Sequence, residues 1–180
     1  MEHNDLRDYL VEGFQKWAYA QRELHLRNAR GLSTGEKSRL DGYFEKRILD
    51  SVRVAGMDRL SNPDFYDELT KSGIPIPMDF TGAIDFSLID CVLIRNELRH
   101  DSPAFISTLF HELVHVVQFD ILGTTRMIEL YTDYLLKSNY HSVPFERQAY
   151  ALTDKFVREG SPFSVRETVG NRRIWGIEIG

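Results

Sequence analysis

The stretch Phe110-His111-Glu112-Leu113-Val114-His115-Val116-Val117-Gln118 decides how the rest of the chain is interpreted. It lies in an apolar run over 106–121 without proline or glycine, which predicts a buried helix. In a helix, His111 and His115 are four residues apart and project from the same face. Two imidazoles in that arrangement can bind one tetrahedral metal ion, usually zinc. Glu112 can take a proton from a metal-bound water without binding the metal itself.

The motif His-Glu-x-x-His also occurs by chance in unrelated helices, so its surroundings matter. The positions between and around its charged groups are apolar, namely Leu109, Phe110, Leu113, Val114, Val116 and Val117. Three ionisable groups in the middle of a buried helix cost free energy unless a metal ion or hydrogen bonds compensate them. A metal site is the favoured interpretation. A metal-free helical scaffold in which the histidines merely pack is the weaker one.

Composition and charge favour a soluble globular protein. The 180 residues fit one domain with its own core, and the net charge of -5 argues against a nucleic-acid partner. A single cysteine, Cys91, excludes an intrachain disulfide and a metal site built from cysteines. We find no secretory signal and no segment that approaches the ~20 apolar residues needed to span a bilayer. We therefore expect a cytoplasmic location and no membrane partner, and the oligomeric state is left open.

Hydrophobic periodicity predicts helices over most of the chain. A long amphipathic helix is expected over 5–27, and the capping box Ser33-x-x-Glu36 opens a second helix that extends to Leu49. Asn62-Pro63 has the residues for the start of a short helix that Gly73 would end. The remaining helices are expected at 103–122, with Ser102 as its cap and Gly123 as its end, at 124–137 and at 144–159.

Strands are expected in a few short segments. Residues 51–55 alternate, 84–87 and 91–95 form a β-hairpin, and 174–179 form a last strand. The sequence therefore predicts an α+β fold, mainly helical, with a small mixed or antiparallel sheet and the motif on a central buried helix. We expect a single domain over 1–180, in which 1–75 is a mostly helical N-terminal part and 82–159 is the metal-site core.

A catalytic zinc ion needs a third protein ligand besides the two histidines. A histidine at the spacing of the extended signature is excluded, because Gln118 and Ile121 occupy the glycine and histidine positions. Glu146 is the preferred third ligand, since it lies in the first turn of the next well-capped helix. Ala149, one turn later on the same face, would let that helix approach the motif helix closely. The alternative is a solvated glutamate that the helix dipole favours in a first turn.

Three other residues compete with Glu146. Glu129 and Asp133 fall on the polar side of the helix over 124–137, where we expect them to face water. His141 lies in the loop before Glu146. A loop positions a side chain less rigidly than a helix, so we expect His141 to be exposed or to aid substrate binding rather than to bind the metal.

His111-Glu112-x-x-His115 followed by Glu146-x-x-Ala149 resembles the zincin-type metallopeptidases of the gluzincin kind. The stretch 84–150 is similar to small bacterial zincin-like domains. The resemblance implies one zinc ion bound by His111, His115 and Glu146, with Glu112 as general base and a peptide or protein as substrate. It also implies that the strand over 91–95 is an edge of the active-site cleft, where an extended peptide can pair.

One position departs from the larger gluzincins, which carry an aspartate four residues after the ligand glutamate to orient the first histidine. Tyr150 occupies that position here. Tyr140, His141 and Tyr150 are candidates for contacts with the transition state or the substrate, because each can donate a hydrogen bond to an oxyanion. Aromatic packing is the alternative for both tyrosines. The sequence thus predicts a zinc-dependent hydrolase, a peptidase. The alternative is a catalytically inactive zincin-fold protein that binds a metal or a partner.

Overall fold

The computed structural model describes residues 3–100, 102–137 and 143–171, and these residues form the α+β fold that the sequence predicts. In chain order the elements are α1 (His3–Leu26), α2 (Thr34–Leu40), α3 (Lys46–Ser51), β1 (Arg53–Met57), α4 (Tyr66–Lys71), the 3-10 turn η1 (Phe80–Gly82), β2 (Asp85–Leu88), β3 (Cys91–Arg95), α5 (Pro103–Leu122), α6 (Thr124–Lys137), α7 (Pro144–Glu159) and α8 (Val165–Gly170).

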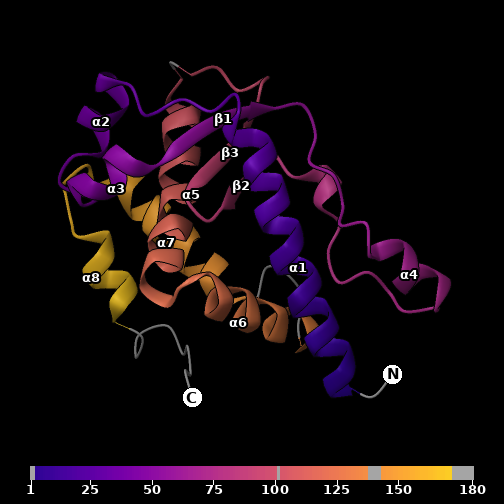
Figure 1. The fold of residues 1–180 in the computed structure, drawn as a ribbon. Coiled ribbons are helices and arrows are strands. Elements are labelled where there is room, and N and C mark those ends of the chain that lie inside the picture. The colour runs from indigo at the N-terminus through magenta and orange to yellow at the C-terminus, as the bar shows by residue number, and fades with distance from the viewer. Residues whose placement is uncertain (1–2, 101, 138–142, 172–180) are drawn as a thin grey trace.

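The three strands form one mixed sheet in the order β1-β3-β2, with β3 parallel to β1 and antiparallel to β2. Side chains alternate along a strand, so β3 presents Val92 and Ile94 to the core around α5 and Cys91 and Leu93 to the core around α1. The sheet therefore lies between two long helices, and Figure 1 shows α5 and α1 on either side of the strands.

The place of β3 corrects one expectation. The strand is central and its backbone is paired on both sides, so it cannot offer an edge to a peptide. Its first four residues, Cys91 to Ile94, are buried, and a continuous apolar run of this kind is typical of a strand covered on both faces. The outer strand on the side of the motif is β2, whose Ser87 is bonded to Glu112 of α5.

The motif helix α5 begins and ends where the sequence predicts. The Ser102 side chain accepts a hydrogen bond from the Phe105 backbone N–H, and Gly123 ends the helix with a positive φ of 78°. By length and composition α5 is the one helix of the described residues that is apolar enough to cross a membrane. However, 67% of its most apolar window is buried inside the protein, as in the core helix of a soluble protein.

Two helices have other bounds than the sequence predicts, and one further helix was not predicted. The second helix does not extend to Leu49, because the chain turns at Gly42, whose φ of 78° is incompatible with a right-handed helix. The helix expected from Asn62-Pro63 begins only at Tyr66, since the Asn62 side chain accepts a hydrogen bond from the Phe80 N–H instead. The tail contains α8, which Ser164 caps. The strand expected over 174–179 lies outside the described residues.

Candidate metal centre

His111 and His115 project from α5 toward Glu146 in the first turn of α7. The Nε2 atoms of the two histidines are 3.3 Å apart. Glu146 Oε2 lies 3.6 Å from His111 Nε2, and Oε1 lies 3.4 Å from His115 Nε2. The candidate ligand atoms of these three buried residues all lie within 4.8 Å of one another. Two imidazoles and a carboxylate around one point could therefore hold a metal ion.

Glu146 carries the clearest sign that a cation fits this place. Its Oε1 accepts a hydrogen bond of 2.7 Å from the Tyr131 hydroxyl, whereas the buried Oε2 has no hydrogen-bond partner among the described residues. A buried carboxylate oxygen without a partner costs free energy, which a bound cation would offset. Burial raises the pKa of Glu146, but the charge of His115 and the contacts with His111 and Tyr131 outweigh it and hold the pKa well below its usual range.

His115 is oriented by a chain of buried amides. Its Nδ1 lies 2.8 Å from Gln118 Oε1, and Gln118 Nε2 donates to the Phe145 carbonyl at 3.1 Å and to Gln148 Oε1 at 2.8 Å. Because the Phe145 carbonyl can only accept, the Gln118 amide must turn its oxygen toward His115, whose Nδ1 is then the donor. This fixes the tautomer that presents Nε2 to the centre as a ligand atom.

His115 and Glu146 form an ion pair when no metal is bound. Burial lowers the pKa of His115, but the negative charge of Glu146 outweighs it and raises the pKa to about 9. A metal ion at this place would displace the proton from His115, because only the neutral imidazole is a ligand.

Glu112 lies beside the three candidate ligands without joining them. Its Oε1 is 4.0 Å from His111 Nε2, and its Oε2 is 2.8 Å from the Ser87 hydroxyl of β2, which also contacts the Glu112 carbonyl at 2.8 Å. Burial raises the pKa of Glu112 to about 8. A carboxyl group whose pKa is strongly shifted, held next to a cation site, is a candidate for proton transfer.

The strand β2 contributes a second polar side chain that the sequence analysis missed. Asp85 pairs with Ile94 and Ser87 pairs with Val92, so both lie on the face of the sheet that meets α5. Burial raises the pKa of Asp85, and the charges of His111 and His115 and a hydrogen bond from its own backbone N–H oppose this only in part. Polar residues that alternate along a strand usually face water, and nothing local showed that this face is covered.

The other predicted residues are placed as follows. Tyr150 is 52% exposed, and its ring centroid lies 4.6 Å from that of His111, so the tyrosine packs on the histidine. Asp133 pairs with Arg7, and Glu129 pairs with Arg126 of its own helix. Both carboxylates are half-buried in these ion pairs rather than solvated, and neither joins the candidate ligands. Tyr140 and His141 lie outside the described residues.

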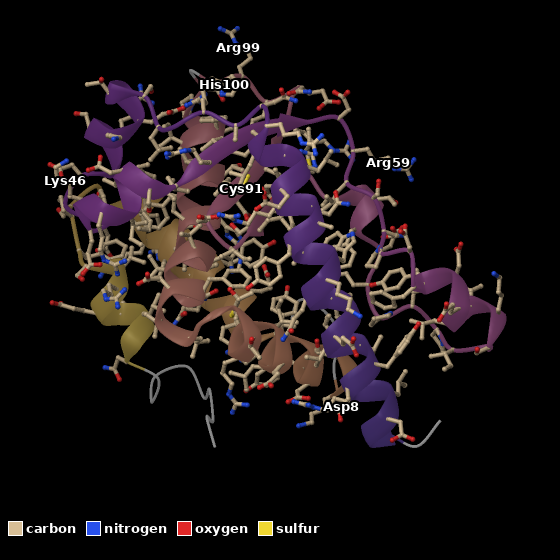
Figure 2. The ribbon with its side chains drawn as sticks, viewed as in Figure 1. Asp8, Lys46, Arg59, Cys91, Arg99 and His100 are labelled. Carbon is tan, nitrogen blue, oxygen red and sulfur yellow. The ribbon has the colours of Figure 1, made fainter. Side chains whose placement is uncertain are left out.

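Cys91 takes no part in the centre. Figure 2 shows it inside the molecule, whereas the labelled charged side chains Lys46, Arg59 and Arg99 lie at the periphery. It belongs to the core around α1, on the opposite face of the sheet from α5. Burial raises the pKa of its thiol to about 11, so the thiol stays protonated and is a poor metal ligand.

Comparisons with protein-family models, with curated proteins and with solved structures found no match to this chain. The function is therefore inferred from the chemistry of the centre itself.

Proposed function

We propose that the protein is a zinc-dependent hydrolase that cleaves peptide bonds. The observation that carries the proposal is the buried set His111, His115 and Glu146 with Glu112 held beside it. A zinc ion with three protein ligands supplies an open position, a bound water of pKa about 7 and a Lewis acid for a carbonyl. This is also the ligand set that the resemblance to gluzincins implies.

Two histidines and one carboxylate also bind iron(II) in oxygenases, so the ligand set alone does not select zinc. Glu112 favours hydrolysis, because that reaction needs a proton acceptor close to the attacking water. Its carboxyl lies 4.0 Å from a ligand atom of His111 and is excluded from bulk water. The surroundings thus support a hydrolytic zinc centre.

Glu112 is the proposed general base and then the general acid. It takes a proton from the attacking water and delivers it to the leaving amine. The bond from Ser87 to Oε2 leaves Oε1 on the side of His111, facing the centre.

The proposed peptide substrate pairs with β2, the outer strand, rather than with β3. Among the described residues, only β3 forms backbone hydrogen bonds with residues 85–88. An extended peptide can add to such an edge through its own backbone. Asp85 and Ser87 point from this strand toward α5, so pairing there would bring a peptide bond close to Glu112.

The test is Glu112→Gln, measured for metal content and for cleavage of a broad peptide library by mass spectrometry. We expect one zinc ion per chain in both proteins, and a loss of turnover in the variant of about 10²–10⁴-fold. Wild-type turnover in the variant contradicts the mechanism. Full zinc occupancy with no cleavage by the wild type supports a catalytically inactive metal- or partner-binding protein instead. No zinc after reconstitution leaves only the metal-free scaffold.

A further inference from the structure

A cavity of about 90 Å³ adjoins the candidate metal centre. Its polar lining includes Glu112, His115 and Glu146, together with Asp85 and Ser87 of β2. Most of the remaining wall is aromatic or aliphatic and comes from α1, η1, β2, α5 and α6, including Phe14, Trp17, Phe80, Phe86, Phe119 and Ile128. The reactive groups therefore face a space whose far side is apolar.

The size of this space limits what it can hold. The cavity is partly open to solvent, so its volume limits the group that it can enclose. An engineered cavity of about 150 Å³ binds benzene, which corresponds to about 25 Å³ for each carbon atom. By that ratio the present cavity of about 90 Å³ holds about four carbon atoms. An isobutyl or isopropyl group has this size.

We infer that the cavity takes a short branched aliphatic side chain of the substrate, of the size of leucine or valine, next to the carbonyl group that is cleaved. The inference rests on the proposed function and adds the substrate class to it. The apolar wall binds such a group by removing it from water.

The helix α1 sets the depth of the cavity. Its small residue Ala18 lines the space, and a larger residue there would fill it. Ion pairs hold the helix in place, from Arg7 to Asp133 of α6 and from Arg22 to Asp90 in the turn between β2 and β3. Residue 18 is therefore proposed to determine specificity although it lies far from the motif in sequence.

The probes are acyl hydroxamates, which combine a metal-binding head with an apolar tail, titrated into the zinc-loaded protein by calorimetry. Acetohydroxamate reports on the metal centre alone. A tail of isobutyl size carries three more carbon atoms, so we expect it to bind about 60-fold more tightly, at about fourfold for each buried carbon. A long linear tail gains little beyond that, because the cavity is full.

Two variants test the wall itself. Ala18→Leu adds three carbon atoms inside the cavity and should abolish the preference for the isobutyl tail while acetohydroxamate binds as before. Ala20→Leu is the matched control, since it makes the same change at an exposed position of the same helix. Leu135→Ala, which removes part of the α6 wall, should shift the preference to a longer tail. This second variant keeps the test decisive if Ala18→Leu does not fold.

The outcomes separate the two proposals. Tail-dependent binding that Ala18→Leu removes, or that Leu135→Ala shifts, supports the inference. Equal affinity for all tails, with normal acetohydroxamate binding and peptide cleavage, overturns the inference and leaves the hydrolase intact. No hydroxamate binding to a zinc-loaded protein that cleaves no peptide overturns both.

Discussion

Two glutamates of this protein are buried to nearly the same degree but have different surroundings. Glu36, 6% exposed, receives hydrogen bonds on both oxygens from Arg30 and another from the Ser33 backbone N–H. Glu146, 3% exposed, has a hydrogen bond from Tyr131 on one oxygen and none on the other. Glu36 completes the cap of α2, whereas Glu146 leaves an oxygen open beside two imidazoles. Hydrogen-bond satisfaction, rather than burial, distinguishes a structural carboxylate from one arranged for a ligand.

Of the variants that test this comparison, Glu146→Gln should have the largest effect, and the quantity that changes is the affinity for zinc. The amide keeps the size of the side chain but loses the charge that a cation needs. We expect zinc affinity to fall by more than about 100-fold, because loss of an outer partner of a ligand already costs about 10–100-fold. Competition with a chromophoric chelator measures the affinity. Glu36→Gln is the matched control and should bind zinc like the wild type. Equal affinities in all three proteins would move the third ligand elsewhere.

Gln118→Met should have the next largest effect. It removes the acceptor of His115 Nδ1 and leaves the tautomer of that histidine unspecified. Zinc affinity should fall by about 10–100-fold with the same stoichiometry. Gln148→Met is the control. It changes the same chain of buried amides but keeps the hydrogen bond between Gln118 and His115, so it should alter zinc affinity much less. A Gln148→Met effect as large as that of Gln118→Met would point to packing rather than to the tautomer.

Glu36→Gln should show the smallest effect, and it should appear in stability. Loss of the charged hydrogen bonds with Arg30 should lower the free energy of unfolding by about 1–2 kcal/mol. This lies at the low end of the usual range for charged hydrogen bonds, because Arg30 is partly exposed to solvent. Urea denaturation of the metal-free proteins measures it. In the metal-free protein, Glu146→Gln should lower the free energy of unfolding by less than it weakens the free energy of zinc binding. If Glu36→Gln were as stable as the wild type, its hydrogen bonds would be of no structural consequence.

Local sequence signals predict where most helices and strands lie, but not which elements pack beside one another. Periodicity and caps placed α1, α5, α6 and α7, because these signals act within one turn of helix. The run Cys91 to Ile94 is typical of a strand covered on both faces, which disagrees with the edge position that the family resemblance implies. The α8 helix begins with Ser164-x-x-Glu167, the same sequence pattern that predicts the start of α2, so a local signal for this helix is present.

The candidate ligands could be predicted, but the groups around them could not. His111 and His115 share a helix, so four-residue spacing is enough to place them together. Glu146 followed from Pro144, which opens α7, and from the family resemblance; the cap expected for this helix is absent, because its N-cap residue Val143 has no side-chain acceptor. Ser87 and Tyr131 meet Glu112 and Glu146 only because the sheet and α6 pack against α5, and a single sequence does not encode those contacts in any local pattern.

The order in which the centre's parts appear along the chain has a consequence for its biosynthesis. A polypeptide emerges from the ribosome N-terminal end first. Both histidines come with α5, and Glu146 follows only with α7. A nascent chain that ends before α7 has both histidines and Gln118, but it lacks Glu146 and the Phe145 and Gln148 groups that hold the Gln118 amide. On the proposed function, the protein thus becomes a hydrolase only after α7 has docked on α5, and zinc uptake reports that this docking has taken place.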